Sequence, residues 1–223
     1  MSEWWTYSLS DFLLFSARTY RRLFELYNVD IWPAQSVALA LGCILLALMW
    51  RPRAGQGRYV SVILMVGWIW VAWAFHWRHF VTINWAATYF AYVFAFEALL
   101  LFVFGIVLDE LTFEPRSVAH RVGFALLLFA VFVQPLIAPL TGRGWLQAEV
   151  FGVTPDPTVV ATLGVVLASG RRARWRLGIL PFMWCALSGA VLWTLDAPVD
   201  AVVLPIAAIL VLVVARIARA PAS

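Results

Sequence analysis

The stretch WAATYFAYVFAFEALLLFVFGIVL, residues 85–108, decides the fold of this chain. It carries a single charged residue, Glu97, and it stops at the acidic pair Asp109-Glu110. A helix of about 20 apolar residues crosses the roughly 30 Å hydrocarbon core of a bilayer. The stretch therefore predicts a transmembrane helix that ends where charged residues return.

Composition extends this prediction to the whole chain. The 223 residues are 64% hydrophobic and 13% charged, whereas soluble domains average about 45–50% and about 25%. One globule of this size cannot hide that excess, and a bilayer is the solvent that tolerates it. We therefore expect an all-α, polytopic transmembrane helix bundle with about seven spans. The expected spans are residues 33–50, 59–78, 85–108, 119–140, 159–169, 177–195 and 199–218.

The first 30 residues are expected to form an amphipathic N-terminal segment, followed by the transmembrane domain at residues 31–219. Within residues 10–27, apolar side chains repeat with helical spacing on one side and Arg and Glu lie largely on the other. Ser10 is the expected N-cap, and Asp11 favours the first turn. The pattern predicts an interfacial helix that lies on the membrane or packs across the bundle. Because Met1–Trp5 contain no basic residue, we expect no cleavable signal peptide.

The fifth expected span is unusual, because the apolar run Val159–Ser169 is too short to cross a bilayer alone. It becomes long enough if Phe151–Pro157 enters the membrane as non-helical chain, since Pro155 and Pro157 are expected to forbid regular helix there. Irregular backbone at membrane depth needs protein or a wet cavity around it. Short, proline-interrupted spans often mark binding sites in transporters.

Arginines are distributed unequally between the two ends of the expected spans. Eleven lie on one side, namely Arg51, Arg53, Arg58, Arg116, Arg121, Arg171, Arg172, Arg174, Arg176, Arg216 and Arg219. Five lie on the other side, namely Arg18, Arg21, Arg22, Arg78 and Arg143. The positive-inside rule places the richer side in the cytoplasm, with the N-terminus outside and the C-terminus inside. A re-entrant fifth segment would leave six spans and nearly remove the bias, and the three arginines of residues 10–27 also count against this orientation.

All sixteen basic residues are arginine. The lack of lysine excludes a retinal Schiff base, a pyridoxal Schiff base and a phosphate-binding P-loop. The chain also has no nucleophile elbow and no paired zinc motif, so the sequence favours a non-enzymatic role without deciding it. The formal net charge is +4, and the basic residues lie in short clusters between apolar runs. We expect the lipid bilayer, and not nucleic acid, as the partner of these clusters.

Several polar residues inside or near the spans are candidates for function. Glu97 lies near the middle of its span, which suggests a proton carrier, a cation ligand or a hydrogen-bond anchor; the plainer alternative is a protonated glutamate that joins two helices. His76 and His79 are three residues apart on one predicted helix face and are candidate metal ligands. A metal would need further carboxylates such as Asp156 or Glu149, and the plainer alternative is that His76 donates to a backbone carbonyl.

Three phrases of the sequence point to a family. They are Leu26-Tyr27-Asn28 with Trp32-Pro33-Ala34-Gln35, His76 and Phe80 with Ile83-Asn84 and Ala86-Ala87, and Phe151-Gly152-Val153-Thr154-Pro155 with Pro157-Thr158 and Gly164. Together they resemble a family of bacterial multi-pass membrane proteins known as a domain of unknown function, over about residues 20–215. The resemblance implies a polytopic helical fold in a bacterial inner (plasma) membrane and supplies no activity. That family has cysteine between the two prolines, where this chain has Asp156, and glutamine near the position of Glu97, so the resemblance lends these positions no thiol or metal role.

These observations favour a protein that binds, and moves, a small solute or ion through an outer-facing vestibule. The expected ligand-binding residues are His76, Asn84, Glu97, Asp156 and Thr158. His76 and Asp156 are expected to bind at the mouth and Asn84 and Thr158 to orient the ligand, while Glu97 relays a proton or cation deeper in the membrane. One alternative is a non-catalytic subunit or assembly factor of a respiratory or photosynthetic complex, with a membrane-protein partner or further copies of the chain. Another is a membrane enzyme that uses the outer histidines.

Overall fold

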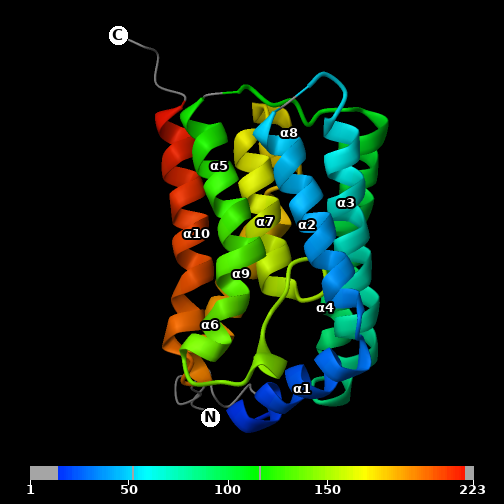
Figure 1. Ribbon diagram of the computed structural model, residues 1–223, viewed down its shortest axis with the longest axis vertical. Helices are drawn as coiled ribbons and strands as arrows, with labels where there is room; N and C mark the ends of the chain where they lie inside the picture. The colour runs from blue at the N-terminus through cyan, green and yellow to red at the C-terminus, as the bar shows by residue number, and fades with distance from the viewer. Residues whose placement is uncertain (1–14, 52, 116, 219–223) are drawn as a thin grey trace, which may run out of the picture.

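The computed structural model describes residues 15–51, 53–115 and 117–218, and it confirms an all-helical bundle (Figure 1). The helices of the first half are α1 (Ala17–Asp30), α2 (Ala34–Trp50), α3 (Gly57–Trp70) continued by η3 (Val71–His79) and η4 (Phe80–Thr82), and α4 (Ala87–Leu100) continued by η5 (Leu101–Val107). Those of the second half are α5 (Val118–Leu128) continued by η6 (Phe129–Val133) and α6 (Gln134–Leu140), η7 (Trp145–Gln147), α7 (Pro155–Ala168), α8 (Arg171–Arg176), α9 (Ile179–Thr194) and α10 (Pro198–Ile217). The η3, η5 and η6 segments are π-helical turns that continue the α-helices before them without ending them.

Several of these helices are long and apolar enough to cross a membrane. Four pass on their own, namely Gly57–Thr82, Ala87–Val107, Val118–Leu140 and Pro198–Ile217. α1 and α2 meet at a bend of 88° and pass when taken together, which makes five candidate spans within the described residues. α7 and α9 are apolar but shorter. Each span expected from the sequence coincides with a helix, but the count of seven stays a prediction because α2, α7 and α9 fall short of full length.

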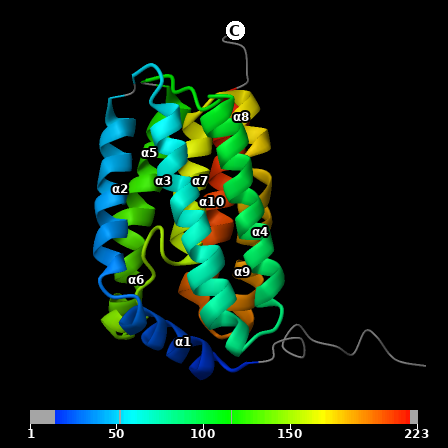
Figure 2. The same ribbon diagram turned by 90° about the vertical axis from the view of Figure 1, so that its right-hand side faces the viewer.

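The long helices run between two ends of the bundle (Figures 1 and 2). α1 lies across one of them, which we call the α1 end. The turns that follow α2, η5 and α7 gather with α8 at the opposite end (Figure 1). These turns and α8 carry six of the eleven arginines expected on the richer side of the membrane, namely Arg51, Arg53, Arg171, Arg172, Arg174 and Arg176. Arg116 and Arg219 lie outside the described residues.

The amphipathic helix expected at residues 10–27 is described from Ala17 onward, as α1. Its expected start at Ser10 and Asp11 lies outside the described residues. Within them, Ser16 is the N-cap, because its Oγ accepts a hydrogen bond of 3.2 Å from the Thr19 backbone N–H.

Long-range hydrogen bonds fasten α1 to the loop before α7. The Tyr27 hydroxyl donates to the Val153 carbonyl oxygen over 2.5 Å. The Asn28 amide donates to the carbonyl oxygens of Leu146 and Ala148 over 2.8 and 3.0 Å. These bonds give carbonyl groups of the loop hydrogen-bond donors from α1. As a result α1 and the loop are held as one layer across the α1 end.

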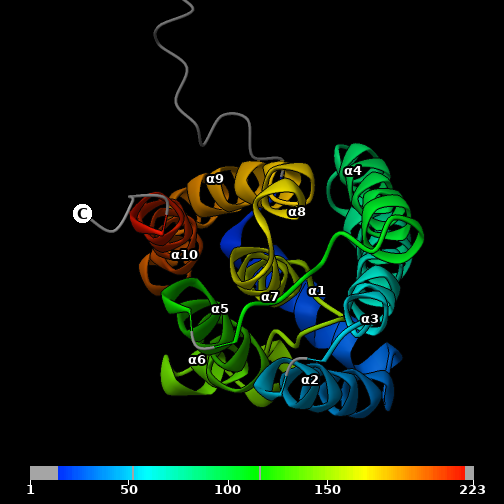
Figure 3. The same ribbon diagram turned by 90° about the horizontal axis from the view of Figure 1, so that it is seen from above.

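α7 occupies the axis of the bundle, with α2, α3, α4, α5, α9 and α10 around it (Figure 3). All residues of Pro155–Ala168 are buried. α5 makes the closest approach, at Gly123 and Gly164, where a Cβ added to Gly164 would lie 2.5 Å from the Gly123 carbonyl oxygen. Small residues let two helix backbones meet in this way. The helix that the sequence presents as the weakest span is therefore the centre of the fold.

The structure corrects the expected break in the fifth span. The chain is non-helical up to Thr154, but Pro155 and Pro157 lie in the first turn of α7. Proline is tolerated there because the N–H groups of a first turn have no partner within the helix. The prediction that these two prolines exclude regular helix is therefore wrong. The irregular segment before them is tied to the helix through Thr158, whose hydroxyl accepts from the Gly152 N–H over 2.9 Å and donates to the Thr154 carbonyl oxygen over 2.6 Å.

Candidate functional site

The site is built around Asp156, the second residue of α7. Its buried carboxylate accepts a hydrogen bond of 2.8 Å from the Trp184 indole N–H and bonds of 3.0 Å from the Ser188 hydroxyl. Trp184 and Ser188 are four residues apart on α9 and so present their side chains on one face. The positive N-terminal end of α7 also favours a carboxylate at this place. These contacts explain how a carboxylate is accommodated inside an apolar bundle.

A cavity of about 240 Å³, which we call the vestibule, lies beside this carboxylate at the α1 end. Its lining consists of Phe15, Tyr20, Phe80, Asn84, Ala86, Phe90, Trp184, Leu187, Ser188, Ala190, Val191 and Thr194. Most of these side chains are apolar or aromatic, and a few carry a hydroxyl or amide group. The volume is somewhat below that of pockets for drug-sized ligands, which run to about 300–1,000 Å³. The vestibule therefore suits a small solute with few polar groups.

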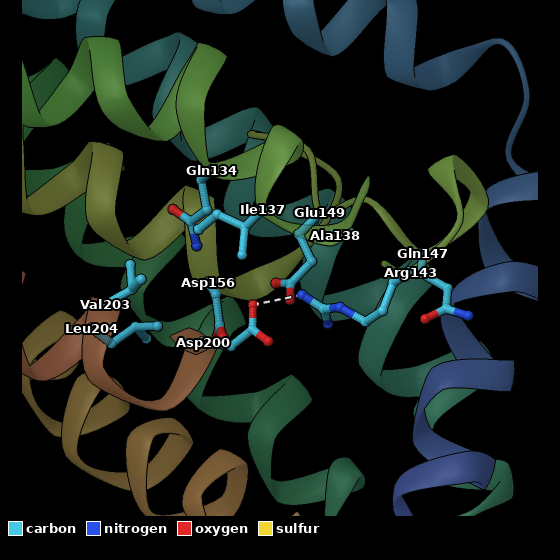
Figure 4. A pocket seen from close by; sticks show the side chains of 10 residues that line it. All are labelled: Gln134, Ile137, Ala138, Arg143, Gln147, Glu149, Asp156, Asp200, Val203 and Leu204. Carbon is cyan, nitrogen blue, oxygen red and sulfur yellow. Dashed lines mark hydrogen bonds and ion pairs between the residues drawn. The ribbon is translucent and has the colours of Figure 1, made fainter. Parts of the chain in front are cut away.

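A second, much smaller cavity adjoins Asp156 on the side of α6 and α10 (Figure 4). We call it the acidic chamber, and its polar lining consists of Gln134, Arg143, Gln147, Glu149, Asp156 and Asp200. Its free volume of about 10 Å³ is room for roughly one water-sized particle. Trp184 and Ser188 are the side chains that connect the two cavities, because they line the vestibule and donate to Asp156.

In the acidic chamber, one carboxylate forms an ion pair and another has an oxygen without a partner within the described part of the chain. The Arg143 guanidinium forms an ion pair of 2.8 Å with Asp200, and both side chains are largely buried. Among the described residues, neither Glu149 Oε2 nor Gln134 Oε1 has a hydrogen-bond partner, and both atoms are shielded from solvent. Burial raises the pKa of Glu149 well above its usual range; the nearby carboxylates of Asp156 and Asp200 add to this rise, and Arg143 opposes it. The chamber thus holds three carboxyl groups around one cation.

His76 lies behind Trp184 and does not line either cavity. It is fully buried, and its ring packs against Phe94 and Trp184 at centroid distances of 4.6 and 5.3 Å. Neither ring nitrogen has a hydrogen-bond partner within the described part of the chain. The predicted bond to a backbone carbonyl is therefore absent there, and His76 contributes to the site through its contact with Trp184.

His79 faces a different environment from His76. Its Nδ1 lies 2.7 Å from the Ala74 carbonyl oxygen and its Nε2 lies 3.1 Å from an Asp30 carboxylate oxygen. The π-helical turn, which is wider than an α-turn, separates side chains that would share a face three residues apart in an α-helix. No group of three His, Cys, Asp or Glu within the described ranges is arranged to hold a metal ion. The metal hypothesis therefore has no geometric support.

The other expected site residues have separate roles in the structure. Asn84 lines the vestibule and its side-chain oxygen accepts from the Ala86 N–H over 3.1 Å, just before α4. Thr158 is buried, and its hydroxyl accepts a hydrogen bond from the Gly152 N–H in the loop before α7. Glu97 is buried on α4 with both carboxyl oxygens unpartnered among the described residues. It lines neither the vestibule nor the acidic chamber, so neither cavity connects Glu97 with Asp156.

Asp156 and Asn84 are among the site residues expected from the sequence, whereas Trp184, Ser188, Arg143 and Asp200, which complete the two cavities, are not. Trp184 and Ser188 follow helical spacing toward one face, and this polar pair within an apolar run is a signal that could have been used. Arg143 and Asp200 are 57 positions apart, so no local pattern joins them.

A model of a family of unknown function (DUF6064) matches residues 17–222 of the chain. No curated protein and no solved structure shows a significant match. The family match covers every described helix from α1 to α10, the whole lining of the acidic chamber and the lining of the vestibule except Phe15.

Proposed function

We propose, for a chain that belongs to the DUF6064 family of unknown function, that it binds a small solute in the vestibule and moves it across the membrane under the control of Asp156. One observation carries this proposal: Trp184 and Ser188 line the vestibule and also hold the Asp156 carboxylate. A solute that contacts these side chains shares them with a buried acid. Binding and the charge of Asp156 are then coupled through the same two donors.

The lining of the vestibule suggests the class of solute. Aromatic rings of Phe80, Phe90 and Trp184 supply apolar contact, and Asn84 and Ser188 supply a few hydrogen-bonding groups. A compact, largely apolar molecule with one polar group matches this surface. The short axial helix with irregular chain before it also supports transport, because broken spans often form the binding sites of transporters.

We further propose that the protein resides in a bacterial inner membrane with the α1 end outside. The arginine-rich turns at the opposite end support this orientation, since such turns favour the cytoplasmic side. The vestibule then opens toward the outer half of the membrane.

A cavity-filling substitution tests the solute site. Ala190 lines the vestibule, whereas Ala186 lies one turn away on the same helix, is exposed and does not line it. Purified wild type, Ala190→Phe and Ala186→Phe would be melted in detergent with a panel of small alcohols, amides and carboxylic acids. We expect some compounds to raise the melting temperature of wild type and Ala186→Phe but not of Ala190→Phe.

Compounds that pass this screen would then be tested for flux in proteoliposomes that contain wild type or Asp156→Asn. Altered flux in Asp156→Asn is the expected result. If no compound stabilises the wild type, or if Ala190→Phe responds like Ala186→Phe, the vestibule is not a solute site.

A second candidate function, membership in a larger membrane complex, is favoured by a groove along the side of the helix bundle. The groove lies between η3 and α4, has a volume of about 490 Å³ and includes the exposed aromatic residues Trp73, Trp77 and Tyr92. Ala91, Ala95 and Ala98 also line it, and such small residues allow a partner helix to approach closely. Native mass spectrometry after extraction in mild detergent tests this: a stoichiometric partner that Ala95→Trp releases supports the complex, and a clean wild-type monomer excludes it.

A further inference from the structure

Another small cavity lies between the acidic chamber and α1. It has a free volume of about 20 Å³, and we call it the antechamber. Tyr20, Arg21 and Ala17 of α1 are part of its lining. Arg143, Gln147 and Glu149 line the antechamber and the acidic chamber together. These three side chains therefore stand between two spaces that each hold about one water molecule.

Charged and titratable groups face Glu149 from several elements. Arg143 precedes it in the same connection, and Asp156 and Asp200 come from α7 and α10. α1 contributes Tyr20 and Arg21 at the antechamber. A further carboxylate, Glu25, is joined to this wall through a hydrogen bond of 2.8 Å from the Gln147 amide. α9 contributes the apolar side chain of Leu192, and Leu195 follows at the C-cap of this helix.

The ion pair of this cluster leaves an excess of acid. Arg143 is held by Asp200 at 2.8 Å, and Asp156 is held by the neutral donors Trp184 and Ser188. Within the described residues, the shielded Glu149 Oε2 has neither a donor nor a cation in contact. Neighbouring carboxyl groups in a place of low dielectric do not all ionise together. Arg21, the other cation at the antechamber, is exposed and forms no ion pair with Glu149 within the described residues. A proton bound by one of the carboxyl groups would reduce the remaining excess of negative charge.

A proton meets the geometric limits of the chamber better than a metal ion. The free space is about 10 Å³, and the described part of the chain offers no arrangement of three acid, histidine or cysteine ligands for a metal. One water molecule fits that space and can carry a proton between two carboxyl groups. Gln134 Oε1, buried and without a partner in the described residues, is an acceptor available to such a water molecule.

We propose that Glu149 is a proton-binding residue that connects water beneath α1 with Asp156. A hydronium ion in the antechamber gives its proton to the Glu149 carboxylate, which leaves a water molecule and a neutral carboxylic acid. Glu149 then passes that proton to the Asp156 carboxylate, directly or through one water molecule, and returns to its charged form. A neutral Asp156 accepts weaker hydrogen bonds from Trp184 and Ser188. This inference does not depend on whether the vestibule binds a solute.

Infrared difference spectroscopy of the reconstituted protein during a pH titration tests the proposal without any solute. We expect wild type to show the carbonyl band of a protonated, buried carboxyl group that disappears as the pH rises. Glu149→Gln, which keeps the side-chain shape, should lose the band, and Glu97→Gln and Glu25→Gln should keep it. A band that titrates identically in wild type and Glu149→Gln would overturn the assignment.

The route from α1 is tested by the rate of hydrogen–deuterium exchange of the same band. Ala17→Trp fills the antechamber from α1 without changing a titratable group. We expect the band to keep its pH dependence in Ala17→Trp but to exchange more slowly than in wild type. Unchanged exchange would exclude the antechamber as the route. Because these readouts need no transport, their failure is separate from failure of the solute proposal.

Discussion

The contact between Gly123 and Gly164 allows a quantitative prediction for Gly164→Ala. The new Cβ would lie 2.5 Å from the Gly123 carbonyl oxygen and 3.0 Å from the Leu127 backbone nitrogen, whereas ordinary contact begins at 3.4 Å. Both neighbours are backbone atoms, so a side-chain rotation cannot relieve the overlap, and α5 and α7 must move apart by about 0.9 Å. Overpacking of a tight core typically costs about 1–3 kcal/mol. We expect the upper end, about 3 kcal/mol.

Thermal melting in detergent measures this effect. For a chain of this length, about 3 kcal/mol corresponds to a fall of roughly 6–12 °C in melting temperature. Gly144→Ala is the matched control, because Gly144 has an ordinary φ of −72° and nothing lies within 4 Å of its added Cβ. It should melt like wild type. Gly164→Ala melting within about 2 °C of wild type would show that the two helices do not touch at this place, which would contradict the reasoning.

Three further predictions use the same melting assay. Tyr27→Phe removes the donor to the Val153 carbonyl oxygen and should lower stability by about 1–3 kcal/mol; equal melting would contradict the bond. Arg143→Ala leaves Asp200 without its ion-pair partner and should lower stability by about 3–5 kcal/mol, with much of the loss recovered when Asp200→Ala is added; simple additivity would argue against the pair. The pKa of Glu149 is raised in the folded protein, so the folded state keeps a proton that the unfolded state has lost above about pH 4.3. Stability should therefore fall as pH rises from there to the folded pKa, by at most about 1.4 kcal/mol per pH unit, and Glu149→Gln should remove this dependence; an identical pH profile in the variant would contradict it.

The helical fold could be predicted because lipid requires long apolar helices. Residues 85–108 were expected as a span, and the structure has helix from Ala87 to Val107. The central place of α7 could not be predicted in this way. Contact with protein and contact with lipid both favour apolar side chains. The sequence of a helix enclosed by other helices therefore resembles that of a short span that faces lipid. The effect of Pro155 and Pro157 could not be predicted because proline breaks a helix in its interior but is tolerated in its first turn, and the sequence does not show where α7 begins.

The site could be predicted in part, for a related reason. Depth along a span indicates which residues are at similar levels, but it does not fix the direction of a side chain around its helix. Thr158 is expected at the depth of Asp156 and Glu97 is expected deeper in the same pathway, yet neither lines the vestibule or the acidic chamber. Asp156 could be predicted because it is an acidic residue in the irregular segment that precedes the short fifth span. Its hydrogen-bond donors on α9, and Asp200 of α10 in the acidic chamber, depend on packing between distant parts of the chain.

The full enclosure of α7 has a consequence for biogenesis. α7 exposes no side chains to lipid, so moving sideways from the translocation machinery into the bilayer would not stabilise it. Its apolar side chains must be covered by other helices of the same chain. Part of that enclosure, α9 and α10, is synthesised after α7 itself. A nascent chain halted after Ala168 would therefore hold its axial helix with one side uncovered, and α7 should be enclosed only once α9 and α10 have emerged.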